Sequence, residues 1–190
     1  MLIGVMGYTD KRPVIYALIK LLQATGDIAF ITNDRHFRRL LPDHGTVGHF
    51  NNVLIAVTDC SPDEVFIELE HGIDDFEHVI FDTQDMIPNN PDLILYVKGY
   101  DFDDEEKDIL ECIENYTTIK MCYSSSEKNS LNLQPTADVF KAVEMIENKK
   151  LMVPIPARGF NQGLANLLAP KLKMQPKSAL QILNRGWNQR

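Results

Sequence analysis

The chain of 190 residues has few cysteines and no long apolar run. Its three cysteines, Cys60, Cys112 and Cys122, are odd in number and widely spaced, so no disulfide framework is predicted. No stretch approaches the roughly 18 consecutive apolar residues that a membrane-spanning helix needs. The first apolar segment has no basic region before it, so a cleaved secretory signal is not expected. The five histidines show no paired ligand spacing with the cysteines, and no metal site is predicted. These features predict a cytoplasmic protein with reduced thiols.

Acidic residues are missing from the end of the chain. Residues 148–190 contain eight basic residues and no Asp or Glu, so residues 1–147 carry a charge of −16 within the overall −8. The eight basic residues are Lys149, Lys150, Arg158, Lys171, Lys173, Lys177, Arg185 and Arg190. Such asymmetry indicates either an end that meets an anionic partner or a basic end that folds back on the acidic body.

Short apolar runs alternate with helical patterns along the rest of the chain. Several runs are apolar throughout, which is typical of strands buried on both faces of a parallel sheet. The predicted strands are 2–6, 27–32, 52–58, 77–82, 92–98, 118–123 and 151–154. One predicted helix directly follows the turn 7–11. The others span 62–71, 103–115, 136–148 and 158–173. We therefore predict a doubly wound α/β domain with a mainly parallel sheet of about seven strands over residues 1–175. Residues 176–190 form a basic amphipathic tail.

The beginning of the chain carries the strongest local pattern. An apolar strand, 2–6, runs into the glycine turn 7–11 and directly into an amphipathic helix. Strand, tight turn and helix are the geometry of a phosphate-binding loop, because backbone N–H groups and the helix dipole point at the turn. Asp34 and Asp82 follow two other predicted strands. Ligands of open parallel sheets bind beyond the carboxyl ends of the strands, so we expect these carboxylates and the segment 153–156 to face the turn.

The turn 6–12, the strand end Phe81-Asp82-Thr83 and the segment 153–156 together resemble the MinD/ParA group of deviant-Walker P-loop ATPases. The resemblance covers about residues 1–175 in element order. It implies a P-loop NTPase-like fold, with ATP and magnesium as the cofactors of the family. The family's Walker B aspartate falls on Asp82, and its aspartate after the second strand falls near Thr32 or Asp34. The vestigial nucleotide site that the resemblance implies consists of Gly7, Thr9, Asp10, Lys11, Arg12, Asp34 and Asp82.

The loop itself departs from the family pattern, Lys-Gly-Gly-x-Gly-Lys-Thr. Only Gly7 and Lys11 match it. The first lysine of the pattern, which family members present across a dimer, falls on Met6. A glycine falls on Asp10, whose carboxylate repels phosphate and can itself accept from the N–H groups at the start of the helix. The threonine that holds magnesium falls on Arg12. Loss of one phosphate-stabilising group typically costs about 2.7–4 kcal/mol of catalysis, so fast ATP hydrolysis is not expected.

The resemblance implies a non-catalytic or weakly catalytic factor that positions or assembles a bacterial machine, such as a pilus, secretion, conjugation or partition apparatus. The ATPase-like proteins that localise tight-adherence pili offer the nearest analogy. Protein partners and a homodimer are expected. Two alternatives remain: an active ATPase in which Lys11 and Arg12 hold phosphates and Asp82 holds magnesium, and a module that tethers DNA through its basic end.

The basic end itself allows two interpretations. Residues 179–187 have apolar positions with basic flanks, which suits a helix on an anionic membrane surface at the inner face of the membrane. The same residues suit packing on the body of the protein. Contact with membrane or DNA would run through Lys171, Lys173, Lys177, Arg185 and Arg190.

Overall fold

A computed structural model describes residues 1–87, 89–99, 104–123 and 130–186. The strands are β1 (Leu2–Met6), β2 (Ile28–Thr32), β3 (Val47–Phe50), β4 (Val53–Val57), β5 (His78–Asp82), β6 (Leu93–Lys98), β7 (Thr117–Lys120) and β8 (Ser130–Asn132). The α-helices are α1 (Arg12–Leu22), α2 (Pro62–Glu68), α3 (Asp104–Glu111), α4 (Ala137–Lys149), α5 (Arg158–Leu168) and α6 (Pro176–Asn184). Three 3₁₀ helices are η1 (Arg35–Leu40), η2 (Pro42–His44) and η3 (Ile73–Asp75).

The strands form one eight-stranded sheet in the order β3-β4-β2-β5-β1-β6-β7-β8. Neighbours pair in parallel, except that β3 pairs antiparallel with β4. β1 lies near the middle, between β5 and β6. The prediction of a mainly parallel α/β sheet is therefore confirmed, with eight strands instead of about seven.

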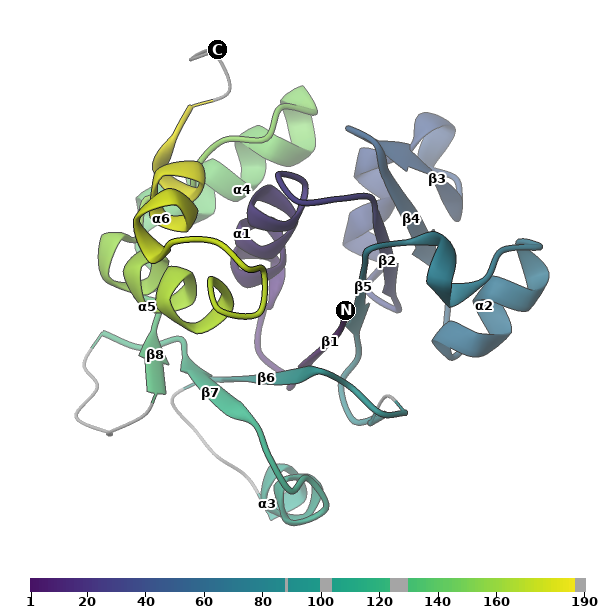
Figure 1. Ribbon diagram of the computed structural model, residues 1–190, viewed down its shortest axis with the longest axis horizontal. Helices are drawn as coiled ribbons and strands as arrows, with labels where there is room; N and C mark the ends of the chain where they lie inside the picture. The colour runs from purple at the N-terminus through teal and green to yellow at the C-terminus, as the bar shows by residue number, and fades with distance from the viewer. Residues whose placement is uncertain (88, 100–103, 124–129, 187–190) are drawn as a thin grey trace.

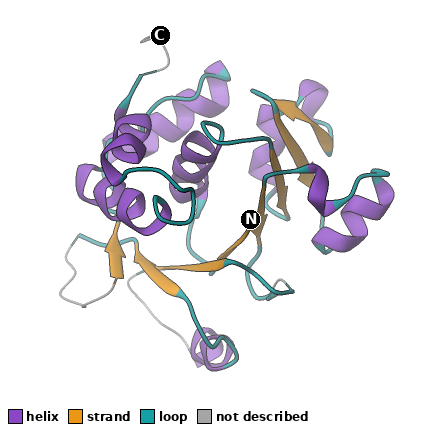
Figure 2. Ribbon diagram, in the orientation of Figure 1, coloured by secondary structure: helices purple, strands orange, loops and turns teal. Residues whose placement is uncertain are grey.

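Helices cover both faces of this sheet (Figures 1 and 2). One face packs against α1, α4, α5 and α6 in the largest core cluster, to which β1 contributes Ile3 and Val5. On the opposite face, alternate residues of the same strands pack against α2 and α3, for example Ala29 and Ile31 of β2. The arrangement is doubly wound. α1 is its central helix: every residue from Pro13 to Leu22 is buried, although the sequence predicted a single apolar stripe.

One predicted strand is wrong, and two strands were not predicted. Residues 151–154 are not a strand, because Pro154 and Pro156 lack the N–H groups that a ladder needs. This segment instead enters the core through Met152 and Ile155. Two strands, β3 and β8, were missed because both lie at sheet edges and neither is a continuous apolar run.

Helix ends differ from the predicted bounds in three places. α2 ends at Glu68 instead of 71. α5 ends at Leu168 instead of 173, two residues before Pro170, which cannot continue a helix. α3 covers less than the predicted 103–115, and Asp103 lies outside the described residues. The predicted start of α2 is confirmed: Ser61 and Glu64 form a capping box, in which the Ser61 N–H donates to Glu64 Oε2 at 2.8 Å.

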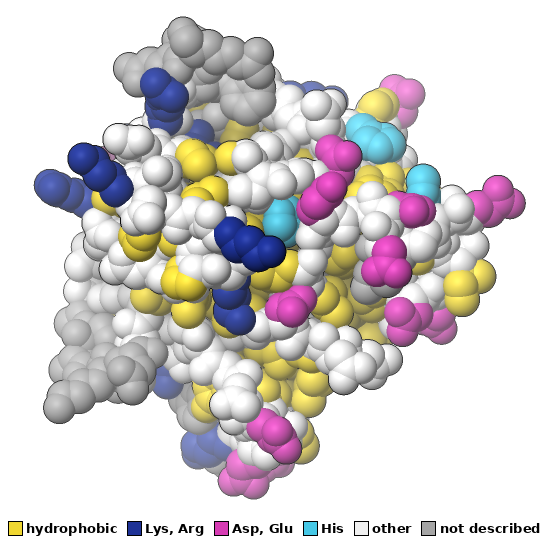
Figure 3. Space-filling model, viewed as in Figure 1, with side chains coloured by type: hydrophobic (Ala, Val, Ile, Leu, Met, Phe, Trp, Pro, Cys, Tyr) yellow, Lys and Arg dark blue, Asp and Glu magenta, His cyan; other side chains and the backbone are white. Residues whose placement is uncertain are grey.

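The charge asymmetry of the sequence is also an asymmetry in space. In Figure 3, Lys and Arg side chains gather over α5, α6 and their connection, whereas Asp and Glu gather on the side of α2. α6 packs on α1 and α5, with Ala179 and Leu183 buried. None of the helices in the described ranges is both long and apolar enough to cross a membrane.

Candidate functional site

The glycine turn lies at the carboxyl end of β1, in the middle of the sheet. Gly7 has φ 115°, a conformation that favours glycine, and a Cβ there would lie 2.1 Å from the carbonyl oxygen of Val97 on β6. On the other side, the Gly7 N–H donates to the carbonyl oxygen of Gln84, 3.2 Å away, just after β5. The turn is therefore fixed by both neighbouring strands.

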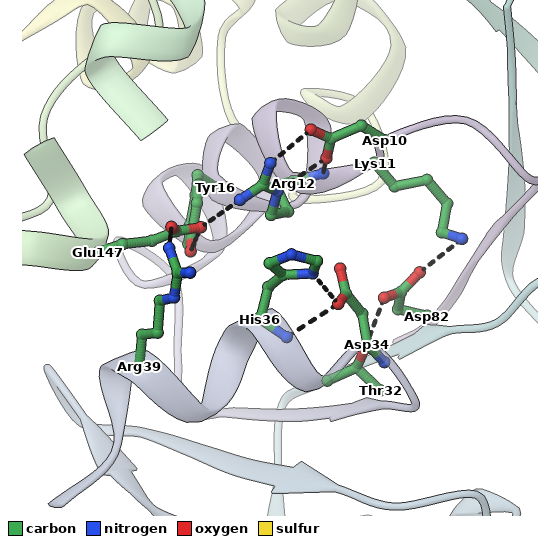
Figure 4. A network of polar contacts seen from close by, with 10 residues as sticks. All are labelled: Asp10, Lys11, Arg12, Tyr16, Thr32, Asp34, His36, Arg39, Asp82 and Glu147. Atoms are coloured by element: carbon green, nitrogen blue, oxygen red, sulfur yellow. Dashed lines mark hydrogen bonds and ion pairs between the residues drawn. The ribbon is translucent and has the colours of Figure 1, made fainter. Parts of the chain in front are cut away.

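Lys11 folds back over this turn and meets Asp82 (Figure 4). Its Nζ donates to the carbonyl oxygen of Gly7 at 2.6 Å and lies 3.2 Å from Asp82 Oδ1. Asp82 ends β5 and is only 1% exposed; its Oδ2 accepts a hydrogen bond of 2.6 Å from Thr32 Oγ1 at the end of β2. Three adjacent strands thus bring a lysine, an aspartate and a threonine into contact.

Burial raises the pKa of Asp82, and the opposing effects of the Lys11 charge and the Thr32 hydrogen bond do not cancel this rise. Oδ1 faces the Lys11 ammonium group as an ion pair and has no second partner among the described residues.

Arg12 and Asp10 form a second, bidentate pair at the mouth of the turn. Arg12 Nε donates to Asp10 Oδ1 at 2.9 Å, and Arg12 Nη2 donates to Asp10 Oδ2 at 2.7 Å. Oδ1 also accepts from the backbone N–H of Arg12 at 3.1 Å, so Asp10 occupies an N–H group at the start of α1, as its position predicts. Partial burial raises the pKa of Asp10, but the hydrogen bonds and charge of Arg12 outweigh it and the net pKa is lowered.

Arg12 also reaches a buried carboxylate that the sequence did not single out, Glu147 near the end of α4. Arg12 Nη1 donates to Glu147 Oε1 at 3.0 Å, and the hydroxyl of Tyr16 donates to the same oxygen at 3.2 Å. Arg39 of η1 lies 3.5 Å from Oε2. The Glu147 side chain is 1% exposed. Desolvation and the charge of Glu147 raise the pKa of the Tyr16 hydroxyl far above its ordinary range, so Tyr16 remains a donor.

Asp34 caps the N-terminus of the adjoining 3₁₀ helix η1. Its Oδ1 accepts from the backbone N–H of His36 at 2.9 Å and lies 2.6 Å from His36 Nδ1. A pocket of about 460 Å³ opens between residues 8–12, residues 33–36 and Gln84. Thr9, Asp10, Lys11, Arg12 and Asp34 line this pocket.

The seven residues predicted for the site therefore lie together at the carboxyl ends of β1, β2 and β5. Five line the pocket, while Gly7 and Asp82 contact Lys11. The segment 153–156, expected to face the turn, is not among the described residues that line it. Pro156 instead lines a separate pocket beside β8 and the start of α5.

No sequence pattern pointed to Glu147, and the basic helix η1 was also not predicted. Glu147 sits on a helix with many charged neighbours, where a carboxylate is usually solvated, and its partner Arg12 is 135 positions away. The cluster Arg35, Arg38 and Arg39 was a visible signal, because three arginines occur in five residues after a predicted strand.

The basic residues assigned to partners are mostly described. Lys171 donates to the carbonyl oxygen of Asp92 at 3.0 Å. Arg190 and Trp187 lie outside the described residues. Contact with membrane or DNA stays a prediction.

No protein-family model matches the chain, and no curated protein matches it.

Proposed function

We propose that this protein is a degenerate member of the MinD/ParA group of P-loop ATPases that acts by binding partners instead of hydrolysing ATP. It would position or assemble a bacterial machine such as a pilus, secretion, conjugation or partition apparatus. The edge of the sheet that carries the turn, and the basic C-terminal end, are the surfaces proposed to bind partners or a second copy of the chain.

One observation carries this proposal: the charged groups of the turn neutralise one another. Lys11 forms an ion pair with Asp82 and donates a hydrogen bond to the Gly7 carbonyl oxygen. Arg12 forms ion pairs with Asp10 and Glu147. A triphosphate would have to replace these contacts, and the Asp10 carboxylate already stands at the mouth of the turn.

The cost of opening this arrangement is large. If Arg12 turned toward a phosphate, Glu147 would lose its closest cation while remaining buried. Breaking a buried pair by removal of one partner costs about 3–5 kcal/mol. Since about 1.4 kcal/mol is tenfold in affinity, this cost alone weakens nucleotide binding roughly 100-fold or more.

A specific observation favours the second candidate, an active ATPase. Lys11, Asp82 and Thr32 meet beyond the carboxyl ends of adjacent strands, and Asp82 Oδ1 has no partner other than Lys11 among the described residues. In a working site of this kind, the lysine would hold phosphates and the aspartate would hold magnesium.

Calorimetric titration with ATP and magnesium separates the two candidates. We expect no binding tighter than about 1 mM for the wild type, because ATP would first have to displace the salt bridges that Lys11 and Arg12 make within the protein. Lys11→Ala should then change nothing. Micromolar binding that needs magnesium and is lost in Lys11→Ala, but kept in the exposed control Lys141→Ala, would establish the ATPase instead.

The positioning role needs its own test. A fluorescent fusion expressed from the native locus should form foci or a polar cap, and Lys141→Ala, outside both proposed surfaces, should leave that pattern unchanged. Uniform fluorescence would contradict the positioning role, even if no nucleotide binds.

A further inference from the structure

A second pocket lies at the opposite edge of the sheet from the glycine turn. It is formed by the end of α1 and the turn into β2, by the β3–β4 turn, and by the end of α6. Its volume is about 360 Å³, within the range of small-molecule sites. Lys20, Asn51, Asn52 and Arg185 are among its lining residues. We call it the Lys20 pocket.

Lys20 is the unusual residue of this pocket. It is the one charged residue in the fully buried stretch Pro13–Leu22 of α1, and it is 8% exposed. The stem of Lys20 is buried, while its Nζ keeps some exposed surface, so the ammonium group reaches the pocket. Within the described ranges, Lys20 has no hydrogen bond and no ion pair. Burial of the side chain lowers the pKa of its ammonium group.

A structural explanation for Lys20 would be that it neutralises the carbonyl groups at the end of α1. The backbone already serves those groups. The carbonyl oxygen of Leu21 accepts from the N–H of Ala24 at 3.3 Å, and that of Leu22 accepts from the N–H groups of Thr25 and Gly26 at 2.9 and 3.2 Å. These carbonyl groups therefore do not depend on Lys20 for a hydrogen bond.

Arg185 brings a second cation to the same pocket from a different element. It follows the last residue of α6, which packs against α1 (Figure 1). Arg185 is exposed, and its guanidinium has no hydrogen-bond or ion-pair partner across the described part of the chain. Among the described lining residues, Asp27 supplies the one carboxylate, against these two cations. The exposed Asn51 and Asn52 add amide groups that can donate hydrogen bonds.

We propose that the Lys20 pocket binds a small ligand that carries a carboxylate or a phosphate group, with Lys20 and Arg185 as its two cationic contacts. The ligand supplies the negative charge that Lys20 lacks among the described residues. Charge-assisted hydrogen bonds to an oxyanion are the strong kind, and both side chains offer several donors. The site is independent of the glycine turn and of the function proposed for that turn.

The proposal has a signature that a structural role for Lys20 does not share. Lys20→Met removes an unpaired charge from an apolar helix while it keeps the length of the side chain. The variant should therefore melt at a higher temperature than the wild type without ligand, and should lose the response to anions. If Lys20 instead stabilised the end of α1, the same variant would melt at a lower temperature.

The experiment is thermal unfolding with inorganic phosphate or acetate as probes, each compared with sodium chloride at the same ionic strength. The wild type should gain stability from at least one probe, and amide resonances of Asn51 and Asn52 should shift in NMR spectra. Arg185→Gln should weaken the response at least tenfold. Lys177→Gln, an exposed lysine of α6 outside this pocket, should leave it unchanged.

A response to phosphate alone or acetate alone would assign the ligand class. The proposal is overturned if neither probe acts beyond sodium chloride, if Lys20→Met keeps the response, or if Lys20→Met melts below the wild type.

Discussion

Replacement of Arg12 by methionine tests how the turn is held. Methionine keeps most of the apolar stem but removes the guanidinium that joins Asp10 to Glu147. Glu147 would remain 1% exposed, with the Tyr16 hydroxyl and with Arg39 at 3.5 Å. Breaking a buried ion pair in this way costs about 3–5 kcal/mol. Since Arg39 remains near Glu147, we expect the lower end, about 3 kcal/mol.

Urea unfolding followed by circular dichroism measures this loss as a lower midpoint with an unchanged slope. In thermal unfolding, about 3 kcal/mol corresponds to a fall in Tm of roughly 6–12 °C for a domain of this size. The double variant Arg12→Met with Glu147→Leu should recover most of the loss, because it leaves no buried charge behind. Arg35→Met, an exposed arginine of η1, is the matched control and should stay within about 0.5 kcal/mol of the wild type.

Two results would refute this reasoning. A loss below about 1 kcal/mol for Arg12→Met would mean that Glu147 finds other compensation. A double variant as unstable as the single one would mean that packing of the Arg12 stem, and not the exposed charge of Glu147, explains the loss.

Four other predictions concern single positions. Burial raises the pKa of Asp82 in the folded state, so its contribution to stability is most favourable below about pH 4 and is lost as the pH rises through the folded-state pKa. In urea titrations, the free energy of unfolding of the wild type should therefore fall over that pH range relative to that of Asp82→Asn. Gly7→Ala should destabilise the protein by more than about 3 kcal/mol, since positive φ and a carbonyl oxygen 2.1 Å from the new Cβ act together. Gly159→Ala, whose Cβ meets nothing within 4 Å, should stabilise α5 by about 0.4–1 kcal/mol. Tyr16→Phe should cost about 1.5 kcal/mol through the lost hydrogen bond to Glu147.

Each of these has a clear contrary result. A constant difference between wild type and Asp82→Asn across the acidic range would show that Asp82 has an ordinary pKa. Equal effects of alanine at Gly7 and Gly159 would show that the turn is not confined by β6. A neutral Tyr16→Phe variant would place the hydroxyl outside the network of Glu147.

The central part of the fold was predictable because its strands are buried on both faces. β2, β4 and β5 are buried at every position, and their apolar runs of four, five and three residues mark them in the sequence. The edges gave no such signal. In β3 only Phe50 is buried, and an edge strand of three residues such as β8 has too few positions to show a pattern. Residues 151–154 failed for the opposite reason, since an apolar run can fill a core without joining a sheet.

The site was half predictable for a similar reason. Gly7, Lys11 and Asp82 stand at strand ends, where topology brings distant residues together, and the sequence places them correctly. Glu147 could not be found in this way. Its role depends on the packing of α4 beside α1, and no local pattern separates a buried glutamate on a helix from a solvated one.

The complete burial of α1 between the sheet and the C-terminal helices has an evolutionary consequence. A helix on a protein surface tolerates change every third or fourth residue, along the side that meets water. Residues 13–22 have no such side. A comprehensive mutational scan should therefore show uniform intolerance along this helix to every charged replacement, with no repeating rhythm. Position 20 should stand apart, because it already carries a charge and borders the Lys20 pocket.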